Sequence, residues 1–345
     1  MTTQHVSYEE AFLTLKGNKN GSWFAPEGSD SSRMPESVAG PRIHSGLARI
    51  EPPPRLPVTN RVFFTIGSCF ARVIELELQR RRIPVPNCDR RLYLENPDLF
   101  RGKREGADSA SFLNRYNVPS MQQEIRVISG DVPRDPDWLL CRSGDLWADL
   151  HYANLVHHVP LADCRRRREL VWSQQAAAFA AANTFILTLG LCEAWFDRKS
   201  EAYLDVAPPR PLAPADRRRF ELHFVDYGTN LRALEDIHRI IRKYKGDNFE
   251  LILTVSPIPL NATFTKSDIV VANAEAKAIL RAVAGEAARR LAGVSYFPAY
   301  EIAVNSDPAA TWMPDGLHVQ RSMANHIVAT FLRTLDRDSP APVAF

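Results

Sequence analysis

The chain has 345 residues, and 43 Lys and Arg against 40 Asp and Glu give it a net charge of +3. This length suits one large domain or two small ones, and so small a charge does not indicate nucleic-acid binding. No apolar run approaches the roughly 20 residues of a membrane helix, and residues 1–22 lack the apolar core of a signal peptide. Five scattered cysteines without a C-x-x-C argue against a disulfide framework and against a zinc site of cysteine ligands. We therefore expect a cytoplasmic protein with no bound metal or cofactor.

The first part of the chain predicts an irregular arm followed by the main domain. Residues 1–60 are rich in Gly, Ser and Pro and show one helix-like stretch near Tyr8–Leu15. A domain is expected over residues 61–335 and a short tail over 336–345. Its first elements are a buried strand at 61–66 and a helix that ends by Pro84. Residues 85–160 are predicted to form an insertion beside the main sheet, with a loop at 93–100, a helix capped by Ser120 and a hairpin at 137–149.

The second half alternates apolar strands with amphipathic helices. Strands are predicted at 184–189, 249–255 and 294–297, and helices at 167–182, 230–243, 273–291 and 319–335. Continuous apolar strands that alternate with helices indicate a parallel sheet covered on both faces, which is an α/β fold. Ligands of such sheets bind beyond the carboxyl ends of the strands, so we expect the site there.

The first strand runs into Gly67-Ser68-Cys69, which is the candidate nucleophile segment. A glycine allows a sharp turn, and a residue at the start of the next helix lies near unpaired backbone N–H groups and the positive end of the helix dipole. A thiol in this position is expected to have a lowered pKa, and the same N–H groups suit an oxyanion. The alternative is an inert cysteine buried behind a tight turn.

Near the other end of the chain, Asp315 and His318 supply a candidate base and its partner. A carboxylate three residues from an imidazole can bind one ring nitrogen and fix the tautomer. The segment follows the last strand and precedes the last helix, opposite the nucleophile segment. A capped helix start is the alternative for so short a pattern.

A third segment, from Thr188 to Trp195, ends a core strand at Gly190. Backbone N–H groups near Gly190 are candidate oxyanion donors, and Glu193 is a candidate to bind a substrate hydroxyl, to hold another loop or simply to begin a helix. No glycine-rich phosphate motif follows any strand, which argues against dinucleotide cofactors and nucleoside triphosphates.

Taken together, these segments resemble the bacterial GSCFA family. The resemblance covers about residues 60–335 and rests on five segments in order: Thr65–Ala71, Tyr116–Ile125, Thr188–Gly190 with Glu193 and Trp195, Leu253–Pro259, and Tyr296–Ile302 with Asp315 and His318. This family is similar to the SGNH (GDSL-like) hydrolases. The resemblance implies a three-layer α/β/α sandwich with a flavodoxin-like, mostly parallel sheet.

The resemblance also implies roles for single residues. The hydrolase pattern Gly-Asp-Ser falls on Gly67, Ser68 and Cys69, which makes Cys69 the expected nucleophile and Ser68 its rival. His318 matches the base and Asp315 its partner. The hydrolase pattern Gly-x-Asn-Asp begins at Gly190 and ends at Glu193 but lacks the Asn, and Asn117 is a candidate to replace that oxyanion donor.

The expected function is acyl-ester chemistry on a carbohydrate or polysaccharide precursor, as an esterase or an O-acyltransferase. Acyl-CoA is then a candidate co-substrate, with the arginine runs 80–82 or 165–168 as candidates to meet its phosphates, although such runs are usually solvated surfaces. The alternative from another class is a non-catalytic carbohydrate-binding protein on the same fold. The sequence gives no indication of the oligomeric state.

Overall fold

The computed structural model describes residues 6–18, 20–23, 38–43, 46–53, 58–89, 91–100, 109–152, 157–208 and 218–335. The predicted tail at 336–345 and parts of the predicted arm lie outside these residues. None of the described helices is both long enough and apolar enough to cross a membrane.

A four-stranded parallel sheet forms the centre of the molecule. Its strands are β1 (Phe63–Gly67), β4 (Thr184–Leu189), β8 (Glu250–Val255) and β9 (Val294–Tyr296), which lie side by side in chain order. Gly67 pairs with Thr188, and Thr188 pairs with Thr254. The predicted strands are confirmed to within two residues at each end, and their carboxyl ends meet at one edge of the sheet.

Helices cover both faces of this sheet. Alternate strand residues point to opposite sides, and because these residues are apolar on both sides, each face needs a layer of helices to bury it. Phe64, Leu187 and Leu253 pack on one side, in a core shared with α5 (Val118–Ile128), α6 (Leu161–Ala181), α7 (Tyr227–Lys245) and α8 (Ile269–Arg290). Phe63, Ile186 and Ile252 pack on the other side with α2 (Cys69–Arg80), α9 (Ala299–Val304) and α11 (Arg321–Leu335). The expected α/β sandwich of three layers is therefore present.

The segment from 85 to 160 departs from its predicted details at two places. Tyr93–Phe100 is not a loop but belongs to two short helices, α3 (Arg91–Glu95) and α4 (Pro97–Phe100), and its aromatic rings pack on Phe112. The residue that caps α5 is Asn117 and not Ser120. The backbone N–H of Ser120 donates a hydrogen bond to the Asn117 side chain. The hairpin is confirmed as β2 (Leu140–Ser143) and β3 (Leu146–Asp149).

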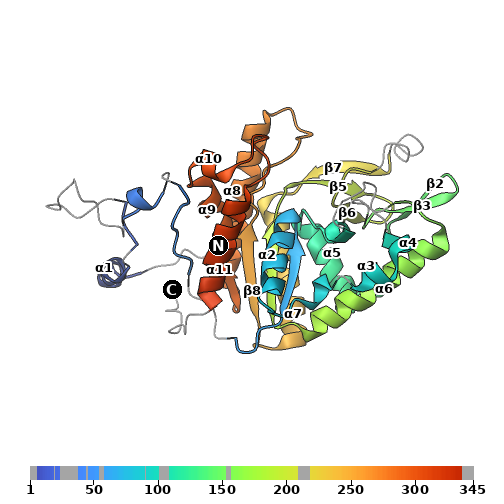
Figure 1. Cartoon of the computed structure of the whole chain (residues 1–345), viewed down its shortest axis with the longest axis horizontal. Coiled ribbons are helices and arrows are strands. Elements are labelled where there is room, and N and C mark those ends of the chain that lie inside the picture. The colour runs from blue at the N-terminus through green and yellow to red at the C-terminus, as the bar shows by residue number, and fades with distance from the viewer. Residues whose placement is uncertain are drawn as a thin grey trace.

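A second small sheet lies after β4 and was not predicted. Its antiparallel strands are β5 (Glu193–Asp197), β6 (Ala202–Leu204) and β7 (Phe220–Phe224), in the order β6-β5-β7. Figure 1 shows α1 (Tyr8–Gly17) at the left end of the molecule, opposite to α6 and the β2–β3 hairpin. The short helix α10 (Pro308–Thr311) precedes the loop that carries His318.

Candidate active site

The turn after β1 requires a glycine because the next strand is too close for a side chain. A Cβ atom on Gly67 would lie 2.6 Å from Cβ of Thr188 and 2.9 Å from its carbonyl oxygen. These atoms belong to the core strand β4 and cannot move away as the tip of a long side chain can. The close approach places Ser68 and Cys69 at the carboxyl edge of the sheet.

Ser68 occupies the N-cap position of α2, and Cys69 is the first helical residue. The Ser68 hydroxyl donates to the Ser256 hydroxyl at 3.3 Å, directly beyond the end of β8. Ser68 is buried, whereas Cys69 is partly exposed, so the thiol is the more accessible of the two candidate nucleophiles.

The pKa of the Cys69 thiol does not follow the prediction from its place on the helix. Burial raises this pKa above its usual value, and the backbone N–H groups of Phe70 and Cys69 and the charges of Arg72 and Lys277 offset only part of that rise. The expected lowering is wrong because the loss of hydration outweighs the helix terminus.

The segment around Tyr116 connects two of the predicted site segments. The Arg115 backbone N–H donates to the Gly67 carbonyl at 2.9 Å, and the Tyr116 carbonyl accepts from the Leu191 N–H at 2.8 Å. Gly190 is needed here as well, since its Cβ would lie 2.8 Å from the Tyr116 carbonyl oxygen. The structure therefore brings the turn after β1, the turn after β4 and residues 115–117 together.

Asn117 uses its side chain to hold secondary structure. Its Oδ1 accepts from the Ser120 N–H at 2.9 Å as the cap of α5, and its Nδ2 donates to the Leu204 carbonyl at 3.0 Å. The amide is almost completely buried. Its two polar atoms are thus engaged in joining α5 to β6.

Glu193 begins β5 rather than a helix, and its carboxylate holds another loop. Oε1 accepts from the Thr263 hydroxyl at 2.6 Å, and Oε2 accepts from the Phe264 N–H at 2.7 Å. Of the roles predicted for Glu193, these contacts agree with the one in which its carboxylate holds a neighbouring loop.

Asp315 and His318 form the dyad that their spacing suggests. Asp315 Oδ2 lies 2.7 Å from His318 Nδ1, and Asp315 Oδ1 accepts from the backbone N–H groups of Leu317 and His318. The hydrogen bonds from His318 and Leu317 hold the pKa of Asp315 at about 2. A carboxylate that is ionised and bound to Nδ1 leaves Nε2 as the nitrogen available to exchange a proton. Both side chains are about half exposed.

No hydrogen bond joins His318 to Cys69 or Ser68 in the described part of the chain. Asp315 and His318 contact each other, and Ser68 and Cys69 lie at the carboxyl edge of the sheet, but this structure has no hydrogen bond between the two groups.

Lys277 is a site residue that the sequence did not indicate. It extends from α8 into the protein, is 1% exposed, and donates from Nζ to the carbonyls of Gly190 and Ile258 at 2.9 and 2.8 Å. Burial lowers the pKa of Lys277 to about 7, although the Cys192 and Cys69 thiols counteract this. In the sequence, Lys277 is one cation within an Ala-rich helix. The only indication that its side chain is buried is its apolar neighbours, Ala276 and Ile279–Leu280.

A buried network of charges supports the Tyr116 segment from behind. Arg115 Nη2 donates to Glu124 at 2.8 Å, and His151 Nε2 also contacts that carboxylate. Burial raises the pKa of Glu124, but the charges of Arg115 and His151 outweigh it and hold that pKa at about 2. Asp205 accepts from the Tyr116 N–H and the Ser120 hydroxyl. These groups fix the residues that line the turns, and removal of one partner would leave a buried charge uncompensated.

The arginine runs differ from the prediction in one case. Arg80, Arg81 and Arg82 are exposed, as expected of a solvated surface. Arg167 and Arg168 are instead almost completely buried, and Arg168 binds Asp149 at 2.5 Å. Only the buried half of the 165–168 run is therefore structural, whereas Arg165 and Arg166 are exposed, Arg165 in an ion pair with Asp137. Within the described residues, no three His, Cys, Asp or Glu side chains gather as metal ligands would.

A comparison with protein-family models matches residues 62–331 to the model described as the GSCFA family. No curated protein and no solved structure matches the chain. The family match contains every candidate site residue described above.

Proposed function

Because the chain belongs to the GSCFA family, we propose that it carries out acyl-ester chemistry on a carbohydrate or a polysaccharide precursor. Cys69 acts as the nucleophile in this proposal, His318 as the base and Asp315 as the residue that orients the imidazole. The observation that carries the proposal is the Asp315–His318 pair, whose 2.7 Å contact at Nδ1 directs Nε2 toward proton transfer.

The proposed reaction proceeds through an acyl-enzyme. His318 Nε2 takes the proton of the Cys69 thiol, and the thiolate attacks the acyl carbonyl to form a C–S bond. The backbone N–H groups at the start of α2 stabilise the oxyanion, as donors fixed in advance do. The bond to the leaving group then breaks, and that group takes the proton from His318. Water in an esterase, or a sugar hydroxyl in an acyltransferase, then gives its proton to His318 and attacks the acyl carbonyl. The C–S bond breaks, and the Cys69 thiolate takes the proton back.

The proposal requires His318 to approach Cys69 when substrate binds. Catalytic hydrogen bonds often tighten only in the substrate complex, and the dyad lies in the short segment between α10 and α11. The half-exposed side chains of both dyad residues support this requirement, because neither of them is itself part of a packed core.

The alternative is a carbohydrate-binding protein without catalytic activity. The raised pKa of Cys69 and the missing bond to His318 favour it. The two functions are distinguished by turnover of an activated acetyl ester and of an acetylated monosaccharide by the protein and four variants: Cys69→Ala, Ser68→Ala, His318→Asn and Asp315→Asn.

We expect Cys69→Ala and His318→Asn each to lower kcat/KM about 100-fold or more, which is the loss usually caused by removal of a nucleophile or a general base. His223→Asn is the matched control, since His223 is also a partly exposed histidine beside a carboxylate, Glu221, at 3.2 Å. Full activity of Cys69→Ala would remove the thiol from the reaction, and activity lost only in Ser68→Ala would move the nucleophile to Ser68.

A further inference from the structure

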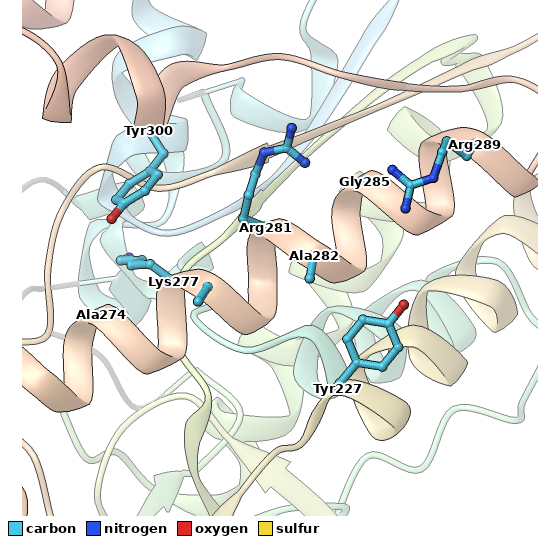
Figure 2. Close-up of a pocket in the computed structure, with 9 residues that line it drawn as sticks. Tyr227, Ala274, Lys277, Arg281, Ala282, Gly285, Arg289 and Tyr300 are labelled. Atoms are coloured by element: carbon cyan, nitrogen blue, oxygen red, sulfur yellow. The ribbon is translucent and has the colours of Figure 1, made fainter. Parts of the chain in front are cut away.

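A basic hollow of about 470 Å³ lies along α8 and was not part of any predicted site (Figure 2). Its walls contain the two cationic side chains of Arg281 and Arg289 and the buried amine of Lys277, and no carboxylate. Tyr300 and Tyr227 border it from α9 and α7, on opposite sides of the helix. Neither tyrosine hydroxyl has a hydrogen-bond partner among the described residues, so both can serve a ligand.

Gly285 lies at the point where the two arginines approach each other. A Cβ atom there would lie 2.8 Å from Nη1 of Arg281 and 3.4 Å from Nη1 of Arg289. Gly285 is within a 22-residue helix and has no left-handed backbone, so no turn requires it. A glycine inside a helix weakens that helix relative to alanine. The two guanidinium groups extend toward the space that this glycine leaves open.

Each arginine keeps donors that its acidic neighbour does not use. Arg281 binds Glu301 through Nε, and Arg289 binds Glu286 through Nη2. The Nη1 groups that meet over Gly285 make no hydrogen bond within the described residues. Guanidinium groups bind phosphate through pairs of such N–H donors, and two of them on one hollow suit a dianion.

We propose that this hollow binds the phosphate group of a small phosphorylated molecule, with Arg281 and Arg289 as its principal ligands. The proposal does not depend on Cys69 being a nucleophile. A second cavity of about 880 Å³ shares Arg281, Gly285 and Arg289. It is also lined by Tyr296, Pro298, Glu301 and Asn305 and by residues 18, 20–23, 39, 42–43 and 50–53 of the arm, so that the carboxylates of Glu51 and Glu301 border it. The rest of the ligand lies in that cavity, and the arm serves as one wall of the binding site.

The test is isothermal titration of the full chain at low ionic strength with inorganic phosphate, glucose 6-phosphate, CoA and 3′-dephospho-CoA. Arg289→Gln is the principal variant, and Arg290→Gln is its control. Arg290 is similarly exposed on the same helix and also contacts Glu286 but does not line the hollow. We expect Arg289→Gln to raise the Kd about tenfold or more, as loss of a charge-assisted pair does, and Arg290→Gln to change it less than twofold.

Gly285→Ala separates a lost site from a lost fold. The new methyl group displaces the Arg281 guanidinium while it strengthens the helix. We therefore expect weaker phosphate binding together with an unchanged or higher Tm. CoA bound at least tenfold more tightly than 3′-dephospho-CoA would identify an acyl carrier as the source of the phosphate, and similar Kd values for all four ligands would support a general phosphate site. No binding of any of them at millimolar concentration, or equal weakening by Arg289→Gln and Arg290→Gln, would overturn the proposal.

Discussion

Lys277 gives the sharpest test of the electrostatics around the candidate site. Replacing it with methionine removes a buried ammonium group and keeps much of the side-chain volume. In the folded protein, burial lowers the pKa of Lys277 from 10.5 to about 7. The carbonyls of Gly190 and Ile258 lose their donor in the variant at every pH. The effect of Lys277→Met therefore depends on pH only because Lys277 is protonated to different extents in the folded and the unfolded wild-type protein.

The sign follows from which state binds more protons. Between pH 7 and 10.5 the unfolded chain keeps the Lys277 proton and the folded protein has released it. The free energy of unfolding of the wild-type protein, relative to Lys277→Met, therefore rises with pH in this window. Below pH 7 both states hold the proton, and the relative stability is lowest and constant. Each pH unit inside the window contributes about 1.4 kcal/mol, so the rise between pH 6 and pH 9 is about 3 kcal/mol.

Equilibrium urea unfolding, followed by tryptophan fluorescence at pH 6, 7, 8 and 9, measures this difference directly. Subtracting the variant from the wild type cancels the titration of groups that the two proteins share. Lys199→Met, which removes an exposed lysine, is the control. A difference between wild type and Lys277→Met that stays constant from pH 6 to pH 9 would refute the account of Lys277 as a buried, readily deprotonated amine.

Three further changes test how the site is held together. Gly67→Ala should destabilise the protein by about 1–3 kcal/mol or more, because its Cβ meets the backbone of β4; thermal unfolding measures this. Asn117→Ala should lower the free energy of unfolding by about 1–2 kcal/mol through loss of the α5 cap, whereas Asn117→Ser keeps a capping oxygen and should cost less. Glu193→Gln should speed hydrogen exchange at the Phe264 amide, which loses a charged acceptor.

Each of these changes has a comparison that can contradict it. Gly17→Ala introduces a methyl group with no atom within 4 Å, and equal destabilisation by it would show that the approach to β4 is not the cause. Loss of ester turnover in Asn117→Ser at full stability would assign Asn117 to catalysis rather than to the cap. Unchanged exchange at Phe264 in Glu193→Gln would show that the carboxylate does not hold the loop.

The core strands could be predicted from sequence because their pattern is strong and local. Thr184–Leu189 is six residues without a charge, ends at a glycine and appears in the structure with the predicted bounds. The pairing of Asp315 with His318 was also predictable, since residues three apart at a turn are neighbours. In both cases the determining contacts lie within a few positions of one another along the chain.

The other features depend on contacts between distant residues. Glu193 begins a strand because it pairs with Phe224 of β7, and the rest of β5 pairs with β7 on one side and with β6 on the other. Lys277 reaches the carbonyl of Gly190, which is 87 positions away, and Arg168 is buried because Asp149 neutralises it. The pKa of Cys69 rises because of the protein packed around it and not because of its helix. Helical spacing and residue type carry none of this information.

The central claim is that Cys69 accepts an acyl group. The most direct measurement is intact-mass spectrometry of the protein after brief exposure to acetyl-CoA and to an activated acetyl ester, followed by peptide mapping, with Cys69→Ala and Ser68→Ala alongside. The account predicts one added acetyl mass that maps to Cys69, disappears in Cys69→Ala and persists in Ser68→Ala. No adduct and no turnover with either donor, or an adduct that survives in Cys69→Ala, would contradict it.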